Sequence, residues 1–332
     1  MSAIGIIALL FIALTVAAMT IWIERRLLVL VQSRSGPNRG GPFGLLQLAA
    51  DAVKMIGKED WTPPFADKPV FVLAPAIAVL TALMTLAVVP FAPGIGVAGL
   101  DIGVLFFLAM SSLGAYAVVL AGWASRSKYP RLGGVRAAAQ LLSYQVFMGL
   151  SLGGVVILAG SFDLRTIVMA QERVWNIVPQ TIGFAVFYIA VLAAMRRLPV
   201  DLPEAESELV GGFHTEYSGL KFGMFFVGEY LAMWVAASLM TVLFFGGWLG
   251  PVLPPLAWFG IKSLLLTTSF IVVRAALPRP RYDQLMHFGW VVLLPLSLAN
   301  LLVTGTLLLT KYPVHDYSRD AGVAVDVHSL LP

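Results

Sequence analysis

Long apolar runs alternate with short polar segments along almost the whole chain. Eight runs carry few charges, and each is long enough to cross the hydrocarbon core of a bilayer. The runs cover residues 2–23, 69–90, 101–122, 141–160, 177–195, 222–245, 257–277 and 287–309. We therefore predict an all-α polytopic membrane protein with about eight transmembrane helices. The helices form one membrane domain over residues 1–310, and a polar tail follows over residues 311–332.

One polar segment has the periodicity of a surface helix. In LLQLAADAVKMIGKEDW, polar side chains recur at spacings of 4, 3 and 4, at Gln47, Asp51, Lys54 and Lys58. Apolar side chains occupy another face, so the pattern predicts an amphipathic helix at the membrane surface. A plain connecting helix fits the same pattern. Asp51 and Lys54 are also spaced to form an ordinary surface ion pair.

Composition agrees with the membrane assignment. The chain is 59% hydrophobic and 12% charged, with a mean hydropathy of +0.87, which is more apolar than a water-soluble core requires. The first run lacks a basic segment before it and is followed directly by Glu24, Arg25 and Arg26. It is therefore predicted to be a retained helix rather than a cleaved signal peptide.

The basic residues are distributed unevenly between alternate polar segments. Seventeen of the 22 Lys and Arg residues follow the first, third, fifth and seventh runs. The positive-inside rule places those segments in the cytoplasm. An even number of spans then puts both termini on the outer side.

The ionisable composition excludes several redox cofactors from this chain. It has no cysteine and only four histidines, so no thiolate set exists for an iron–sulfur cluster or a structural zinc. No histidine pair lies at similar depth on facing runs, which argues against haem. If the protein takes part in redox chemistry, its partners must carry the electrons.

An acidic segment interrupts the apolar pattern. LPVDLPEAESELVGGFHTEYSGLKF (198–222) holds five of the chain's 18 carboxylates, namely Asp201, Glu204, Glu206, Glu208 and Glu216. If 201–210 is helical, three of these share one face, where like charges repel. A solvated acidic loop is the simpler alternative. Hydrophobic flanks and Gly211, Gly212 and Gly219 instead favour a loop that bends into a packed site.

Glu229 continues the acidic series into the sixth run, about seven residues or roughly 10 Å from its start. An ionisable group at that depth costs about 2.5–3.5 kcal/mol and usually faces a bundle interior or water. A proton relay is the favoured interpretation. The alternative is a glutamate that a neighbouring Tyr or Arg satisfies.

Several long motifs resemble one family, the H-type membrane subunit of proton-pumping NADH:quinone oxidoreductase, respiratory complex I, which is subunit 1 of the mitochondrial enzyme. ERRLLVLVQSRSGPNRGGPFGLLQLAADAVKMIGKED is similar to the first loop of this family. GWASRSKYPRLGGVRAAAQLLSY, EAESELVGGFHTEYSGLKFGMFFVGEY and LPRPRYDQLMHFGW resemble the same family in the same order. The resemblance covers the chain from the first run to the eighth.

The resemblance implies a subunit with no activity alone, which forms the membrane part of a quinone chamber and an acidic funnel for protons. Quinone is the implied substrate, partner subunits carry NAD, FMN and the iron–sulfur clusters, and the location is a bacterial inner membrane with periplasmic termini. The implied quinone-binding residues are Glu24, Arg25, Arg34, Asp51 and Lys54. The implied funnel residues are Asp201, Glu204, Glu206, Glu208, Glu216, Glu229 and Tyr144.

The chain departs from the family pattern at two positions. Gln145 in LLSYQVF and Ala194 before LPVDLP stand where the family usually has glutamates. Three alternatives remain open on the sequence. They are the equivalent subunit of a membrane-bound hydrogenase or formate hydrogenlyase, a stand-alone secondary transporter that uses Glu229, and a passive membrane anchor.

Overall fold

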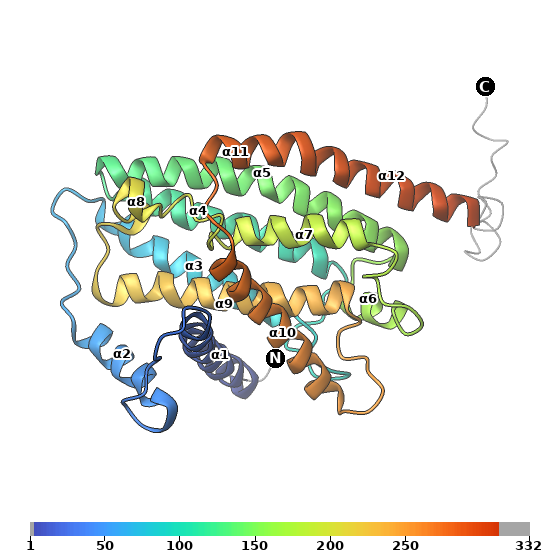
Figure 1. The fold of residues 1–332 in the computed structure, drawn as a ribbon, viewed down its shortest axis with the longest axis horizontal. Helices are drawn as coiled ribbons and strands as arrows, with labels where there is room; N and C mark the ends of the chain where they lie inside the picture. The colour runs from blue at the N-terminus through green and yellow to red at the C-terminus, as the bar shows by residue number, and fades with distance from the viewer. Residues whose placement is uncertain (1–2, 312–332) are drawn as a thin grey trace.

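The computed structural model describes residues 3–311, which form helices joined by turns (Figure 1). The first half of the chain contains α1 (Ala3–Val31), η1 (Pro42–Gly44), α2 (Leu46–Gly57), α3 (Lys68–Val88), α4 (Gly103–Ala124), α5 (Lys128–Ala159) and α6 (Leu164–Ala170). The second half contains α7 (Thr181–Ala194), α8 (Glu206–Leu209), η2 (Gly212–His214), α9 (Gly219–Phe244), α10 (Pro255–Ala276), α11 (Tyr282–Phe288), η3 (Gly289–Leu293) and α12 (Leu294–Lys311).

Every predicted apolar run falls on a helix, and the predicted all-α membrane class is confirmed. Among the described residues, six helical segments are long and apolar enough to cross a membrane: α3, α4, α5, α9, α10 and the segment from α11 to α12. The apolar α7 is shorter, with 14 residues, and α1 has 29 residues. The predicted polar tail from 312 onward and the first two residues lie outside the described part of the chain.

Several helix boundaries differ from the predicted runs, including the end of α1, which extends to Val31. The helix at 141–160 begins much earlier, at Lys128, because Pro130 is tolerated in a first helical turn. The fifth begins at Thr181 rather than 177, since Gln180 has a non-helical backbone and its side chain bonds Thr304 and Asn300 of α12. The sixth begins at Gly219.

The long helix α9 lies at the centre of the arrangement. It packs against α1, α3 and α10, and 72% of its apolar window is buried, against 22–44% in the other five long segments. Most of its side chains therefore contact other parts of the protein. A polar group on α9 therefore lies inside the protein rather than against lipid.

The two ends of the bundle differ. Figure 1 shows α2 and α8 at one end and α6 at the other. The predicted surface helix is confirmed as α2, which has no buried residue and exposes Leu46, Val53 and Ile56. The basic segments, which the positive-inside rule predicts to be cytoplasmic, belong to the end that carries α2 and α8.

The last membrane segment is a single bent unit in which α11 and α12 are joined by one π-helical stretch, η3. Gly289 begins this stretch. A Cβ at Gly289 would lie 2.7 Å from Cε2 of Phe147 on α5, so only glycine allows the two helices to approach so closely. The OH of Tyr144 donates to the Leu285 carbonyl across the same contact at 2.9 Å.

Residues 201–210 do not form one helix, so the condition under which three of the carboxylates would share a face is not met. Only Glu206–Leu209 is helical, and turns precede it because Pro203 lacks an N–H and Ala205 has a left-handed φ of 37°. Asp201 and Glu204 consequently face the interior, whereas Glu208 lies outside. The expectation that glycines bend this loop into a packed site holds at Gly212, whose φ is 58° and where a Cβ would lie 1.9 Å from the Pro203 carbonyl oxygen.

Candidate functional site: a buried charged cavity

A cavity of about 310 Å³ lies beside the central helix α9, among α1, α10 and the segment between α7 and α9. We call it the acidic cavity, since five of its lining side chains are carboxylates. Its charged lining residues are Glu24, Arg25, Arg196, Arg197, Asp201, Glu204, Glu206, Glu229 and Arg274. Leu28, Phe213, Phe222, Phe225, Phe226 and Tyr230 supply apolar and aromatic lining.

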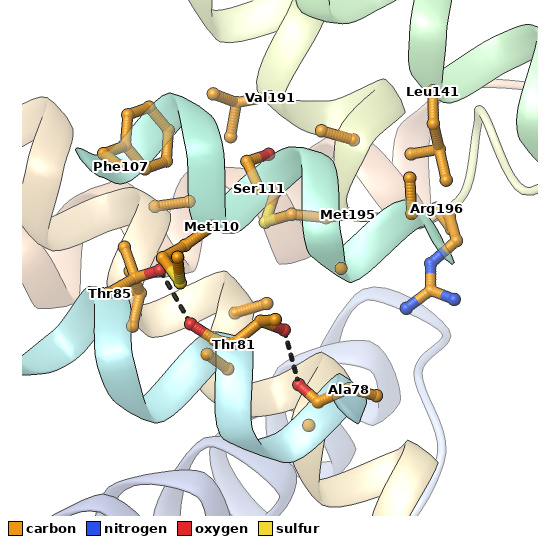
Figure 2. Close-up of a pocket in the computed structure, with 18 of the residues that line it drawn as sticks. Ala78, Thr81, Thr85, Phe107, Met110, Ser111, Leu141, Val191, Met195 and Arg196 are labelled. Carbon is orange, nitrogen blue, oxygen red and sulfur yellow. Dashed lines mark hydrogen bonds between the residues drawn. The ribbon is translucent and has the colours of Figure 1, made fainter. Parts of the chain in front are cut away.

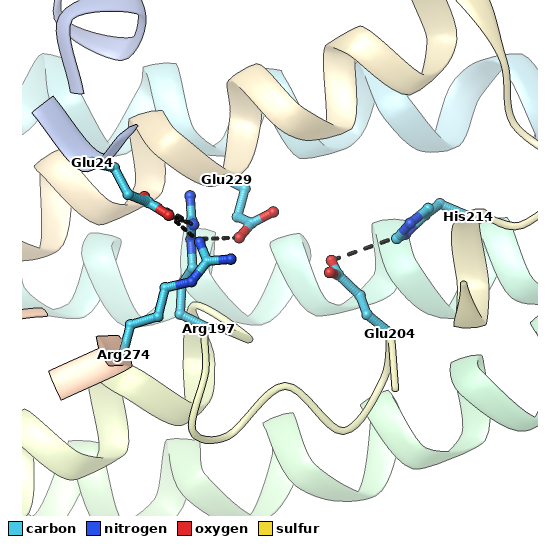
Figure 3. A network of polar contacts seen from close by, with 6 residues as sticks. All are labelled: Glu24, Arg197, Glu204, His214, Glu229 and Arg274. Carbon is cyan, nitrogen blue, oxygen red and sulfur yellow. Dashed lines mark hydrogen bonds and ion pairs between the residues drawn. The ribbon is translucent and has the colours of Figure 1, made fainter. Parts of the chain in front are cut away.

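Four charged side chains converge on one wall of this cavity (Figure 3). Nη1 of Arg197 donates to both Glu24 carboxylate oxygens at 3.0 Å, and Nε of Arg197 lies 2.6 Å from Oε1 of Glu229. Arg274 pairs with Glu24 as well. Two carboxylates and two guanidinium groups thus form a network with no formal net charge, which we call the buried ion network.

Each member of the buried ion network comes from a different segment. Glu24 lies on α1, Glu229 on α9 and Arg274 in the last turn of α10, while Arg197 lies just after α7. The Glu24 and Arg197 side chains are only 3% and 7% exposed. Charges so deeply buried must be paired, so the network links these four segments and the loss of any one member would leave a buried charge without its partner.

Glu229 lies farther from the start of its helix than predicted. It follows the start of α9 by ten residues, which corresponds to about 15 Å of helix rather than roughly 10 Å. The Arg197 guanidinium also lies 4.0 Å from the centre of the Tyr230 ring. Glu229 therefore has the surroundings of the alternative interpretation, in which a neighbouring Arg or Tyr satisfies a buried glutamate.

Asp201, Glu204 and His214 form a second group in the same cavity. Burial, reinforced by the nearby Glu204 carboxylate, raises the pKa of Asp201 to about 8. Burial also raises the pKa of Glu204 against the opposing pull of Arg196, Arg197 and Arg274. Burial lowers the pKa of His214, whose Nδ1 lies 3.9 Å from Oε1 of Glu204. Burial therefore shifts the pKa values of both carboxyls in this group upward, towards neutral pH.

The rim of the acidic cavity is joined to the surface helix α2. Arg25 lines the cavity, and its Nη1 donates to Oδ2 of Asp51 at 2.7 Å. Gln47 donates to the other oxygen of the same carboxylate at 2.9 Å. Asp51 thus pairs with Arg25 rather than with Lys54, contrary to the simple surface pair that the spacing allowed. Lys54 is exposed on α2.

Some of the residues predicted for the site lie elsewhere. Arg34, Asp51 and Lys54 do not line the acidic cavity, nor do Glu208, Glu216 and Tyr144. Glu208 is 48% exposed and pairs with Arg136 at 2.6 Å, which lowers its pKa. Tyr144 is fully buried between α5 and α11. In residues 3–311, no three Asp, Glu, His or Cys side chains are grouped as metal ligands would be.

Three arginines of the cavity, Arg196, Arg197 and Arg274, were not predicted for the site, and neither were His214 and the apolar lining residues. Positive-inside anchoring was a sufficient explanation for each of the arginines. One signal was available: an embedded glutamate requires a buried cation, and Arg197 stands just ahead of the acidic segment. Which arginine it would be depends on tertiary packing.

The two departures from the family pattern also have defined surroundings. The Gln145 amide oxygen accepts from Ser112 Oγ of α4 at 3.0 Å. Ala194, at the end of α7, lines a smaller cavity inside the bundle. Neither position carries a group that titrates.

Comparison with known proteins identifies the family of this chain. Residues 4–305 match the family model described as NADH dehydrogenase. The chain is 60% identical over 301 residues to the H-type subunit of NADH-quinone oxidoreductase from Methylococcus capsulatus, and the match covers 90% of this chain and 95% of that protein. The chain therefore belongs to the NADH dehydrogenase family of membrane subunits, the family of respiratory complex I subunit 1.

Proposed function

We propose that the acidic cavity couples quinone reduction to proton movement within a membrane-bound NADH:quinone oxidoreductase, of which this chain is one subunit. One observation carries the proposal: the buried ion network and the Asp201–Glu204 pair line the same cavity. A charge change at the network alters the field at both carboxylates. Protons are then taken up or released there.

The quinone end of this pathway is assigned to the rim of the cavity at α1 and α2. Reduction of a quinone builds negative charge on its oxygens, and fixed cations such as Arg25 stabilise that charge. The exposed apolar face of α2 allows a lipid-soluble substrate to approach from the bilayer. Glu24, Asp51, Lys54 and Arg34 complete the proposed quinone-binding set.

The proton end is assigned to Asp201, Glu204, Glu206 and Glu229, which line the acidic cavity. Glu216 and Tyr144 belong to the wider funnel in this proposal, outside the cavity itself, whereas the exposed Glu208, which pairs with Arg136, has no part in it. NAD, FMN and iron–sulfur clusters reside in partner subunits. Neither the hydrogenase-type subunit, nor a stand-alone transporter, nor a passive anchor has a specific observation in its favour.

The Asp51→Asn substitution tests the quinone end. We expect quinone reduction to fall roughly tenfold, because Arg25 loses the charged partner that orients it. The partners are 44% and 32% exposed, so the loss of their ion pair costs little stability and the complex still assembles. NADH oxidation with an artificial acceptor should stay at the level of the unmodified complex. Lys58→Met, an exposed change just after the same helix, is the matched control.

The interpretation of this experiment depends on the two activities together. If Asp51→Asn lowers both activities equally, the defect is in assembly. If quinone reduction is unchanged in the assembled variant, the assignment of the quinone end to α1 and α2 is wrong.

We also propose that the end with α2 and α8 faces the cytoplasm of a bacterium and that both termini are periplasmic. Since the chain has no cysteine, introduced thiols report its orientation directly. In right-side-out vesicles, an impermeant thiol reagent should label Asp101→Cys, in the turn before α4, but not Lys58→Cys. The reverse pattern would overturn this orientation.

A further inference from the structure

A second, smaller cavity lies inside the bundle and has a single charged lining residue among the described residues. This inner cavity of about 100 Å³ is enclosed by α3, α4, α5, α7 and α9. Arg196 is its charged residue and also lines the acidic cavity. Figure 2 shows Arg196 at one end of the inner cavity and Phe107 at the other. Arg196 therefore stands at the junction of the two cavities.

The inner cavity has room for water and offers it a few polar partners within a mostly apolar lining. Its volume corresponds to roughly three molecules of liquid water. Thr81 and Thr85 donate their hydroxyl hydrogens to backbone carbonyls of α3, which leaves their oxygen lone pairs free to accept from water. Ser111 adds another hydroxyl from α4. No carboxylate lines this cavity, so an excess proton or a metal cation inside it would lack a counter-charge.

Arg196 is held at the junction by its backbone and by an aromatic ring. Its φ of 57° lies in the left-handed region, which a residue with a side chain rarely adopts and which the end of α7 imposes here. Its guanidinium carbon lies 5.3 Å from the centre of the Phe213 ring. A left-handed residue commonly ends a helix, but that position usually holds glycine, so the half-buried Arg196 side chain is kept there at some cost in backbone strain.

The charge of Arg196 is not neutralised by a direct partner. Its Nη1 is buried and has no hydrogen-bond partner in the described part of the chain, and no carboxylate there pairs with it. Arg197, the next residue, is by contrast paired with two glutamates. The Glu204 carboxyl interacts with Arg196 through space from the side of the acidic cavity, whereas no carboxylate lines the inner cavity. The positive field of Arg196 is therefore least compensated on the side of the inner cavity.

We propose that Arg196 is an electrostatic barrier at the junction of the two cavities, which admits water to the inner cavity and turns back cations, including excess protons. Given the proposed coupling function, on which this consequence rests, Arg196 confines the protons that Asp201 and Glu204 exchange to the acidic cavity. They do not spread into the inner cavity beneath α7.

The barrier can be tested with thiol reagents of equal size and different charge. Ser111→Cys places a thiol in the inner cavity, in a chain that has no other cysteine. The assembled complex, at rest in native membranes, is treated with neutral 2-hydroxyethyl methanethiosulfonate or cationic 2-aminoethyl methanethiosulfonate. The mass of this chain after denaturing separation gives the rate of each modification.

We expect the neutral reagent to react faster than the cationic one when Arg196 is present. Adding Arg196→Met should raise the cationic-to-neutral rate ratio roughly tenfold, the order of magnitude expected for removing one unit charge near the thiol at an effective dielectric constant near 20. Arg196→Lys should leave the ratio low. Leu28→Cys, in the acidic cavity, is the matched control, and its ratio should change little because carboxylates surround it.

Two results would overturn the barrier. One is a ratio at Ser111→Cys that Arg196→Met leaves unchanged, and the other is a thiol that neither reagent modifies in any variant. If Arg196→Met does not assemble, Arg196→Gln removes the same charge and takes its place. Because the resting complex is labelled without turnover, a failure of the coupling proposal would leave these ratios unaffected.

Discussion

Replacing Arg197 with methionine is expected to destabilise the protein more than any other single change at the site. The substitution leaves Glu229 without its ion-pair partner and deprives Glu24 of one of two cations. Loss of one member of a buried ion pair typically costs about 3–5 kcal/mol. We therefore expect much less assembled complex in the membrane and a lower thermal midpoint for what remains.

A second substitution separates this loss of charge balance from a loss of packing. Arg197→Met combined with Glu229→Gln removes the pair together, while Arg274 continues to neutralise Glu24. The double variant should therefore regain a substantial part of the lost assembly and thermal stability. Should the double variant be as unstable as Arg197→Met alone, the buried ion network is not what holds these segments together.

The second large effect is expected in the pH dependence of quinone-coupled turnover. With a pKa of about 8, the Asp201 carboxyl is protonated below that pH and ionised above it. A group that must pass on a proton stops working once it is ionised, so turnover should decline as the pH rises through about 8. Asp201→Asn should remove this limb of the profile and lower turnover roughly tenfold at pH 7.

Glu208→Gln is the matched control for this profile. Glu208 belongs to the same acidic segment, but it is exposed, and its pKa is lowered by Arg136. It is therefore ionised throughout the range around pH 8, and its loss should leave the limb in place. An unmodified profile in Asp201→Asn would show that another group sets the high-pH limb.

Hydrophobic patterning predicted the helices well because membrane spans depend on one local property, an apolar stretch of sufficient length. It failed where tertiary contacts decide. The start of α7 is set by Gln180, whose side chain bonds two residues of α12. The long α5 continues through residues that the hydropathy pattern assigns to a loop.

The sequence was enough to predict the acidic residues of the candidate site, but not three of its four arginines. A carboxylate in an apolar chain is conspicuous, and Asp201, Glu204 and Glu229 were singled out on that ground alone. Arg196, Arg197 and Arg274 were hidden among basic residues that the positive-inside rule already explains. Only the fold separates Arg197, which is 7% exposed within the ion network, from Arg25, which is 44% exposed at the rim.

The spacing of the carboxylates along the acidic segment also failed to predict which of them face the interior. Asp201, Glu204 and Glu208 share a face only if the segment is helical, and a left-handed residue at Ala205 prevents that. Two of the three carboxylates turn inward and the third pairs with Arg136 outside. Which carboxylates face the cavity and which face solvent therefore depends on the turn, and composition alone does not predict it.

The most direct test of the coupling proposal is to measure proton translocation and quinone reduction together in sealed proteoliposomes containing the assembled complex. At pH 7, Asp201→Asn should translocate protons roughly tenfold more slowly than the unmodified complex, while NADH oxidation by an artificial acceptor is retained. Glu208→Gln should match the unmodified complex. Unchanged proton translocation at an unchanged rate of quinone reduction in Asp201→Asn would contradict the account, because the acidic cavity would then lie outside the coupled pathway.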